Sequence, residues 1–160
     1  MADVVVIGVG NRMMGDDAVG PIVIDRLAGR LPESVALVES VGDATHLLDT
    51  WRDARLTVVV DAVVSGGVPG SVHRIDGKAG FPSSWRSAST HLIGVVEAID
   101  LGGAVDMMPD ELVVYGIEIG TVGPGVELAP EIEAAADEVV ELVVEEMAES
   151  GIGYPVLGSR

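Results

Sequence analysis

Two adjacent carboxylates, Asp16 and Asp17, stand where the apolar run at residues 4–9 passes through glycines into a segment with helical periodicity. The N-terminal end of a helix usually binds anions, because its unpaired N–H groups and its dipole favour negative charge. Carboxylates at that position would repel a phosphate and attract a cation. The loop therefore predicts a metal site rather than a nucleotide site.

The glycines of the same loop do not complete a nucleotide-binding motif. A dinucleotide fingerprint that begins with Gly8 and Gly10 needs a third glycine at the position of Met13. Gly10 and Gly15 have the spacing of a phosphate-binding loop, but two aspartates follow instead of lysine and a hydroxyl residue. We therefore expect no nucleotide cofactor.

Two more residues that could bind a metal are predicted to lie near this loop. Asp61 follows the apolar segment 58–60, and His91 stands where a loop enters a predicted helix. Ligands of an open parallel sheet bind outside the carboxyl ends of the strands, so Asp17, Asp61 and His91 should meet there. Oxygen and imidazole ligands of this kind suit nickel, zinc, manganese or iron better than calcium, and the set does not choose among them.

Each candidate also has a purely structural interpretation. Asp16 is expected to cap the first helix by accepting a backbone N–H, which leaves Asp17 to point outward. Asp61 alone could end a strand and accept N–H groups from a turn, and His91 alone could be a polar residue near a helix cap. The conjunction of the three at one edge favours a functional site.

Apolar runs rich in Val and Ile alternate with helical segments, which predicts an α/β fold. We expect a doubly wound, mostly parallel twisted sheet of about five strands with helices on both faces. The residues 72–75 follow a glycine-rich turn and should form an antiparallel hairpin with the preceding strand. The main strands are predicted at residues 4–9, 35–38, 57–64 and 112–119.

Helices are expected between these strands and at the end of the chain. The last is the clearest, because apolar residues recur at helical spacing from Pro130 onward while the opposite face is almost wholly acidic, which we interpret as solvated surface. His46, in the second helix, and His73, in the hairpin, are interpreted as ordinary histidines outside the cluster. The other helices are predicted over residues 17–31, over 43–52, and from near His91 to Gly102 and Gly103.

Composition limits the classes of function. The 160 residues fit one domain over residues 1–150, followed by a tail at 151–160 that we expect to be flexible. The absence of cysteine excludes thiolate catalysis and iron–sulfur ligation by this chain. The formal charge of −17 argues against nucleic acid or anionic membranes as partners and is interpreted as a solvated surface. With no signal sequence or spanning segment recognised, a cytoplasmic location is expected.

The chain resembles the hydrogenase maturation endopeptidases, which remove a C-terminal extension from the nickel-loaded large subunit of nickel–iron hydrogenases. The resemblance covers most of the chain in the expected order. Its four blocks are GVGNRMMGDDAVG after the first strand, VVVDAV around Asp61, SASTHLIGVVEAI around His91, and YGIEIGTVGPGVELAPEIEAA at 115–135.

The resemblance implies that Asp17, Asp61 and His91 bind nickel that the precursor carries, so the metal is mainly a feature of the substrate. Cleavage would then report that nickel has been inserted. Glu118 matches the last block at a strand end and is a secondary site candidate, as is Asp16. Two positions depart from the family pattern: Asp17 stands where Glu is frequent, which retracts the carboxylate by about one bond length, and Ala18 stands where Gly is usual.

The implied enzyme is a peptide hydrolase of aspartic or nickel-dependent type, and its mechanism differs from familiar proteases. The chain has no HExxH motif and no cysteine nucleophile. We expect the three residues chiefly to position metal and substrate, with a water as nucleophile. The alternatives are a nickel-sensing escort or assembly factor that does not cut its partner, and a small-molecule metallohydrolase.

Overall fold

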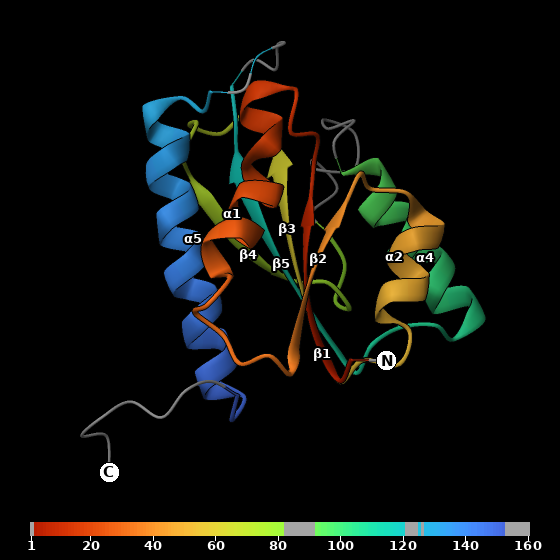
Figure 1. The fold of residues 1–160 in the computed structure, drawn as a ribbon. Coiled ribbons are helices and arrows are strands. Elements are labelled where there is room, and N and C mark those ends of the chain that lie inside the picture. The colour runs from red at the N-terminus through yellow and green to blue at the C-terminus, as the bar shows by residue number, and fades with distance from the viewer. Residues whose placement is uncertain (1, 82–91, 121–124, 126, 153–160) are drawn as a thin grey trace.

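The computed structural model describes residues 2–81, 92–120, 125 and 127–152, and within them the strands form one five-stranded sheet (Figure 1). The strands lie in the order β2-β1-β3-β5-β4. Their bounds are β1 Val4–Val9, β2 Val35–Ser40, β3 Leu56–Val63, β4 Val72–Asp76 and β5 Glu111–Glu118. The four long apolar runs therefore form the strands predicted for them.

The sheet is parallel except at one edge, as predicted. β1 pairs in parallel with β2 and with β3, and β3 pairs in parallel with β5. The carboxyl ends of these four strands therefore share one edge of the sheet, which lies at the top of Figure 1. We call this the carboxyl edge. Both β1 and β3 are buried along their whole length, as expected for strands covered on both faces.

The predicted hairpin is wrong in its pairing, although the antiparallel strand is confirmed. β4 pairs with β5 and not with β3. The connection at residues 64–71 crosses the end of β5, where the Gly70 N–H donates to the Glu118 carbonyl and the Glu118 N–H donates to the Ser71 carbonyl, both at 2.9 Å. β3 is apolar on both faces and takes β5 as its parallel neighbour, so β4 is displaced to the edge.

Helices cover both faces of the sheet, and each face has its own apolar cluster. The helices α1 and α5 pack on one face, and α2 and α4 on the other (Figure 1). Alternate residues of β3 point to opposite clusters, with Val58 and Val60 on the α1 side and Val59 and Val63 on the α2 side. The helix bounds are α1 Val19–Leu27, α2 Ala44–Trp51, α4 Ile93–Val105 and α5 Pro130–Glu149.

The observed helices refine the predicted ones. The first is shorter than predicted, because a 3₁₀ turn, η1 (Gly15–Ala18), precedes α1 and the helix ends at Leu27. The second matches, since the Asp43 carboxylate caps α2 by accepting the His46 N–H at 3.0 Å. The last begins at Pro130 as predicted. Residue His91 and the tail beyond residue 152 lie outside the described residues.

No helix among the residues that the structure describes is both long enough and apolar enough to cross a bilayer. The cytoplasmic location stays a prediction from the sequence.

Candidate functional site

The turn that carries Asp17 is fixed by its own backbone. Gly10 has φ +155°, and a Cβ atom there would lie 2.0 Å from the Asp17 carbonyl oxygen. That space is needed because the Asn11 N–H donates to the same carbonyl at 3.2 Å. The Asp17 N–H in turn donates to the Met14 carbonyl at 3.1 Å. The glycine therefore allows the loop to fold back and place Asp17 at the carboxyl edge.

A second glycine sets the distance between α1 and the sheet. A Cβ atom on Gly20 would lie 2.2 Å from the Val9 carbonyl oxygen and 2.7 Å from that of Val60. Any side chain at this position would push the start of α1 away from β1 and β3. The close approach keeps η1, which directly precedes α1, in contact with β3, the strand that carries Asp61.

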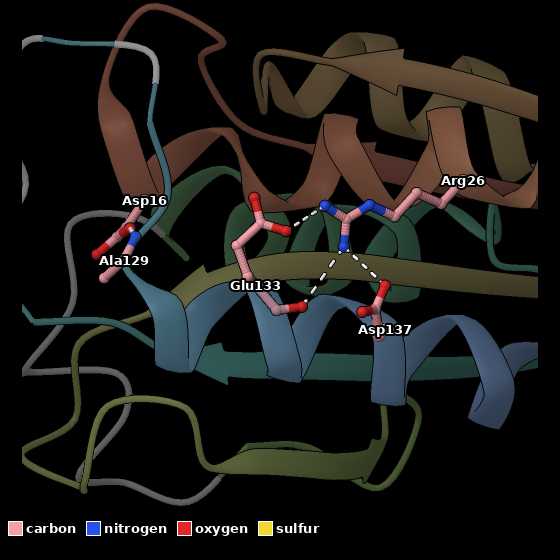
Figure 2. Close-up of polar contacts among 5 residues, drawn as sticks. All are labelled: Asp16, Arg26, Ala129, Glu133 and Asp137. Atoms are coloured by element: carbon pink, nitrogen blue, oxygen red, sulfur yellow. Dashed lines mark hydrogen bonds and ion pairs between the residues drawn. The ribbon is translucent and has the colours of Figure 1, made fainter.

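Asp16 does not cap the first helix, contrary to the prediction. Neither η1 nor α1 has a side-chain cap, and Asp16 Oδ1 instead accepts the Ala129 N–H at 2.9 Å (Figure 2). Ala129 is the N-cap of α5, so Asp16 satisfies one of the unpaired N–H groups where that helix begins. The Gly15 N–H also donates to the Gly125 carbonyl, at 2.7 Å. The segment before α5 is therefore hydrogen-bonded to the turn that carries Asp17 and stabilises it.

An ion-pair network continues the link between α1 and α5. Arg26 of α1 pairs with Glu133, and it donates to Asp137 Oδ1 at 2.8 Å, both on α5 (Figure 2). The hydrogen bond to Glu133 is the main cause that raises the pKa of Arg26, and the charges of Glu133 and Asp137 raise it further against the effect of burial. The acidic face of α5 therefore provides ion-pair partners for arginines of neighbouring elements, as well as the solvated surface predicted for it.

Asp61 is a buried carboxylate on β3, almost completely removed from solvent. Burial raises its pKa well above the usual range, the negative charge of Asp17 raises it further, and the Ala62 N–H opposes the shift. Among the described residues, Oδ2 of this carboxylate has no hydrogen-bond partner. A buried, unpaired carboxylate oxygen is costly, so this atom is a candidate contact for a ligand.

The structure brings Asp17 and Asp61 close enough to interact electrostatically, as the sequence predicted. A cation between them would remove their repulsion and supply the missing partner of Asp61 Oδ2. Within the described part of the chain, no group of three His, Asp or Glu residues could hold a metal ion. The predicted third ligand, His91, lies outside those residues, so the three-residue set stays a prediction.

Glu118, the secondary site candidate, forms a second polar cluster at the same edge, and the sequence did not reveal the other members of this cluster. It is fully buried at the end of β5, where it accepts hydrogen bonds from the N–H and hydroxyl of Ser65, the N–H at 3.2 Å. His73 Nε2 lies 3.3 Å from Glu118 Oε1. His73 is partly buried, as the interpretation of an ordinary surface or partly packed histidine allowed, and it lies beside a buried acid. The pairing of β4 with β5 places His73 beside Glu118, and the pairing of β3 with β5 places Ser65 there.

His46 lies in the first turn of α2 and contacts the end of β2. Its Nδ1 is 3.0 Å from the hydroxyl of Ser40, the last residue of β2, and its ring belongs to the exposed start of α2. This contact fixes the loop after β2. Among the described residues, the candidate site is therefore the pair Asp17 and Asp61, with Glu118 in the neighbouring cluster.

Comparison with known proteins decides the family. A sequence model described as hydrogenase maturation protease matches residues 21–146, which is most of the chain. The chain belongs to the hydrogenase maturation protease family. The matched segment contains Asp61 and His91, whereas Asp16 and Asp17 precede it.

Relatives and solved structures agree with this assignment. This chain is 24% identical over 152 residues to the hydrogenase 2 maturation protease of Escherichia coli, and the match covers 93% of each chain. Its fold superposes on the E. coli maturating endopeptidase HybD with a TM-score of 0.83, covering 94% of both chains at 24% identity. A hydrogenase 2 maturation peptidase from a Thaumarchaeota archaeon is 30% identical, with a TM-score of 0.66, covering 89% of this chain and 96% of that one. The protein is therefore a peptide hydrolase with the fold of this family.

Proposed function

We propose that this maturation protease removes the C-terminal extension of a nickel–iron hydrogenase large-subunit precursor, and that it recognises the nickel already bound in that substrate. One observation carries the proposal: the buried Asp61 Oδ2 lacks a hydrogen-bond partner among the described residues, and the charge of Asp17 lies beside the same carboxylate. Such a pair is poised to accept a cation. The proposed ligands are Asp17, Asp61 and His91.

The same electrostatics favour a metal that arrives with the substrate. Two carboxylates held together repel each other, and burial further disfavours the charged form of Asp61. A divalent cation offsets the repulsion and the cost of burying the charge for as long as it is bound. If the precursor supplies the nickel and most of its ligands, the protease completes its own site on binding the substrate and binds the metal weakly without it.

The residues of the chain then bind and orient rather than form a covalent intermediate. A carboxylate that ligates a metal is a weak base, so we assign Asp17 and Asp61 chiefly to positioning nickel, substrate and a water molecule. The water adds to the carbonyl carbon of the scissile peptide, the C–N bond breaks, and a proton passes to the leaving amine. Glu118 and Asp16 support the loops of this edge through Ser65, His73 and Ala129.

The direct test is to incubate the purified protease with a nickel-loaded precursor and to measure the mass of the precursor. We expect one cleavage near its C-terminus, none in nickel-free precursor, and a loss of at least about a hundredfold in rate for Asp17→Asn and Asp61→Asn. The matched control is Asp53→Asn, an exposed aspartate after α2, which should leave the rate unchanged.

Three outcomes would contradict the proposal. Full processing by Asp61→Asn would remove that carboxylate from the mechanism. An unchanged precursor mass, despite binding by the wild-type chain, would favour an escort or assembly factor. Tight retention of metal by the isolated chain would favour a small-molecule metallohydrolase.

A further inference from the structure

Glu118 hydrogen-bonds to both ends of the segment between β3 and β4, residues 64–71, which we call the β3–β4 connection. Near its start, the N–H and the hydroxyl of Ser65 donate to the Glu118 carboxylate, the N–H at 3.2 Å. At its end, the Glu118 carbonyl accepts the Gly70 N–H and the Glu118 N–H donates to the Ser71 carbonyl, both at 2.9 Å. A single residue at the end of β5 therefore fixes both ends of the β3–β4 connection.

The middle of the β3–β4 connection also lies against Glu118. A Cβ atom on Gly67 would be 3.0 Å from both Cδ and Oε1 of the Glu118 carboxylate. Residues 66–69 are exposed, whereas Glu118 is fully buried. A buried carboxyl group is costly unless its oxygens are hydrogen-bonded, so the two donors of Ser65 offset part of this cost. The β3–β4 connection is therefore built around the Glu118 side chain.

Glu118 and the β3–β4 connection lie close to Asp61. Where β3 pairs with β5, Asp61 is opposite Gly116 and Val63 is opposite Glu118. Neighbouring strands are about 4.8 Å apart and each residue rises about 3.3 Å, so the Cα atoms of Asp61 and Glu118 are roughly 8 Å apart. Alternate residues of a strand face the same side, which places Asp61 with Val63 on the side of α2 and α4. By the same alternation Glu118 is on this side with Val114, so the two acids share one face of the sheet.

The β3–β4 connection needs the contacts with Glu118 because it is rich in glycine. Gly66 and Gly70 have φ +86° and +93°, a region that other residues rarely adopt, and Gly67 lies between them. Glycine loses more conformational freedom on ordering than any other residue. Without the contacts from Glu118, a peptide that binds against this segment would have to order it, and the affinity would fall by that cost.

We propose that Glu118 is a positioning residue of the proteolytic reaction, which holds the β3–β4 connection in place to contact the segment of the precursor that is cut. The inference rests on the proposed function and deepens it, because it names the part of the protease that lies along the substrate peptide. The exposed residues begin at position 66, so about five residues of extended peptide span the distance from Asp61 to them. Glu118 acts through the β3–β4 connection and does not itself touch the scissile peptide.

The first test measures cleavage of the nickel-loaded precursor by two variants of the β3–β4 connection. Ser65→Ala removes the hydroxyl that donates to Glu118, and Gly67→Ala places a methyl group against the carboxylate. Each should raise KM about tenfold and leave kcat unchanged, because a hydrogen bond to a charged group is worth about that factor and the bound substrate restores the order of the connection. The control is Thr50→Ala, which removes a hydroxyl that donates to the His46 carbonyl at 2.6 Å within α2. The control should keep the wild-type KM and kcat.

Variants of Glu118 itself separate positioning from a merely structural role. Glu118→Gln keeps the size of the side chain and one oxygen for the Ser65 N–H, so its KM should lie between those of the wild type and Glu118→Ala. Thermal unfolding shows which variants fold, and if Glu118→Ala does not, Ser65→Ala and Gly67→Ala decide the question. A residue that only maintains the folded protein would, when replaced, lower the apparent kcat at the wild-type KM.

Hydrogen exchange of the free protein tests the positioning role without any substrate. The Gly70 N–H should exchange about tenfold faster in Ser65→Ala and Gly67→Ala than in the wild type, and at the wild-type rate in Thr50→Ala. If the wild-type chain binds the precursor without cutting it, the proposed function fails, while faster exchange and weaker binding by the two connection variants still support the positioning role. Unchanged KM and binding in both variants, a lower kcat at unchanged KM, or unchanged exchange of the Gly70 N–H would overturn it.

Discussion

Asp61 is buried, lies near the negative charge of Asp17, and has one carboxylate oxygen without a hydrogen-bond partner in the described part of the chain. All three features make the charged form of Asp61 unfavourable, so this residue lowers the stability of the free protein. Unfavourable electrostatics of this kind are typical of sites that bind a ligand. The carboxyl has a raised pKa in the folded state, so the folded protein binds its proton more tightly than the unfolded chain does. Its contribution to stability is therefore fully present below about pH 4 and is lost as the pH rises through the raised pKa.

We accordingly expect Asp61→Asn to stabilise the free protein at neutral pH by about 1–3 kcal/mol while it abolishes processing. For a chain of this size, each kcal/mol raises the unfolding temperature by about 2–4 °C. Thermal unfolding between pH 4 and pH 8 measures the effect. The gain should be smallest at the acidic end, and a variant less stable than the wild type at pH 8 would contradict this account of Asp61.

At the scale of elements, the site depends on the close seating of α1 against β1 and β3. The absence of a Cβ atom at Gly20 permits this seating, since the carbonyls of Val9 and Val60 occupy the space. The helix cannot move outward without carrying η1 and Asp17 with it. The close packing of the α1 backbone against the backbones of β1 and β3 therefore positions Asp17, a candidate site residue.

Gly20→Ala should therefore destabilise the protein by about 1–3 kcal/mol through overpacking and should also slow processing. Gly103 of α4 is the matched control, because a Cβ atom there meets nothing within 4 Å. Gly103→Ala should stabilise the protein by up to about 1 kcal/mol through its helix propensity. Denaturant unfolding of both variants measures the difference, and similar effects at the two glycines would contradict it.

A second element-scale connection joins β4, β5 and α5. Tyr115 donates its hydroxyl to Glu146 Oε1 at 2.8 Å, and Arg74 donates to the same oxygen at 2.8 Å. Burial is the main cause that raises the pKa of Tyr115, to about 12, and the Glu146 carboxylate raises it further. The hydrogen bond of Arg74 is the main cause that lowers the pKa of Glu146.

These shifts give a pH dependence with a definite sign. The raised pKa means that Tyr115 contributes stability below about pH 10, its usual value, and that this contribution is lost as the pH rises through about 12. We expect Tyr115→Phe to be less stable than the wild type at pH 8, and the difference to vanish between pH 10 and pH 12. Unfolding by denaturant at each pH measures it. A difference that widens over this range would be the contrary result.

Much of this arrangement could be predicted from the sequence, and the failures have physical causes. Strands such as β3 were predictable because their apolar runs are long and flanked by turn residues, and the rule for parallel sheets then placed Asp17 beside Asp61. The partner of β4 was not predictable, since strand pairing is decided by nonlocal packing. For the same reason the bond from Asp16 to Ala129 and the contact between His73 and Glu118 could not be found from local patterns.

For the molecule as a whole, the dominant feature is an excess of acidic groups: 26 Asp and Glu against nine Lys and Arg. Among the described residues, Arg12, Arg26 and Arg74 each pair with acidic side chains. With 26 acidic and nine basic residues, most carboxylates cannot have a basic residue of their own. Repulsion among like charges opposes the compact state.

Raising the NaCl concentration from about 0.02 M to about 0.5 M should therefore increase the unfolding temperature by several degrees, because salt screens the repulsion. Screening also weakens the exposed ion pairs, but these are worth little individually. Equal concentrations of KCl serve as the control, since simple screening does not distinguish the two cations. A fall in the unfolding temperature would show that the ion pairs outweigh the excess charge.

The contact between Asp16 and Ala129 joins residues 113 positions apart. During synthesis, a ribosome needs on the order of ten seconds to add that many residues. The turn that carries Asp17 is completed only after the start of α5 has left the ribosome and reached it. A nascent chain that has not yet reached α5, or a chain truncated before it, therefore lacks this support for the turn that carries Asp17.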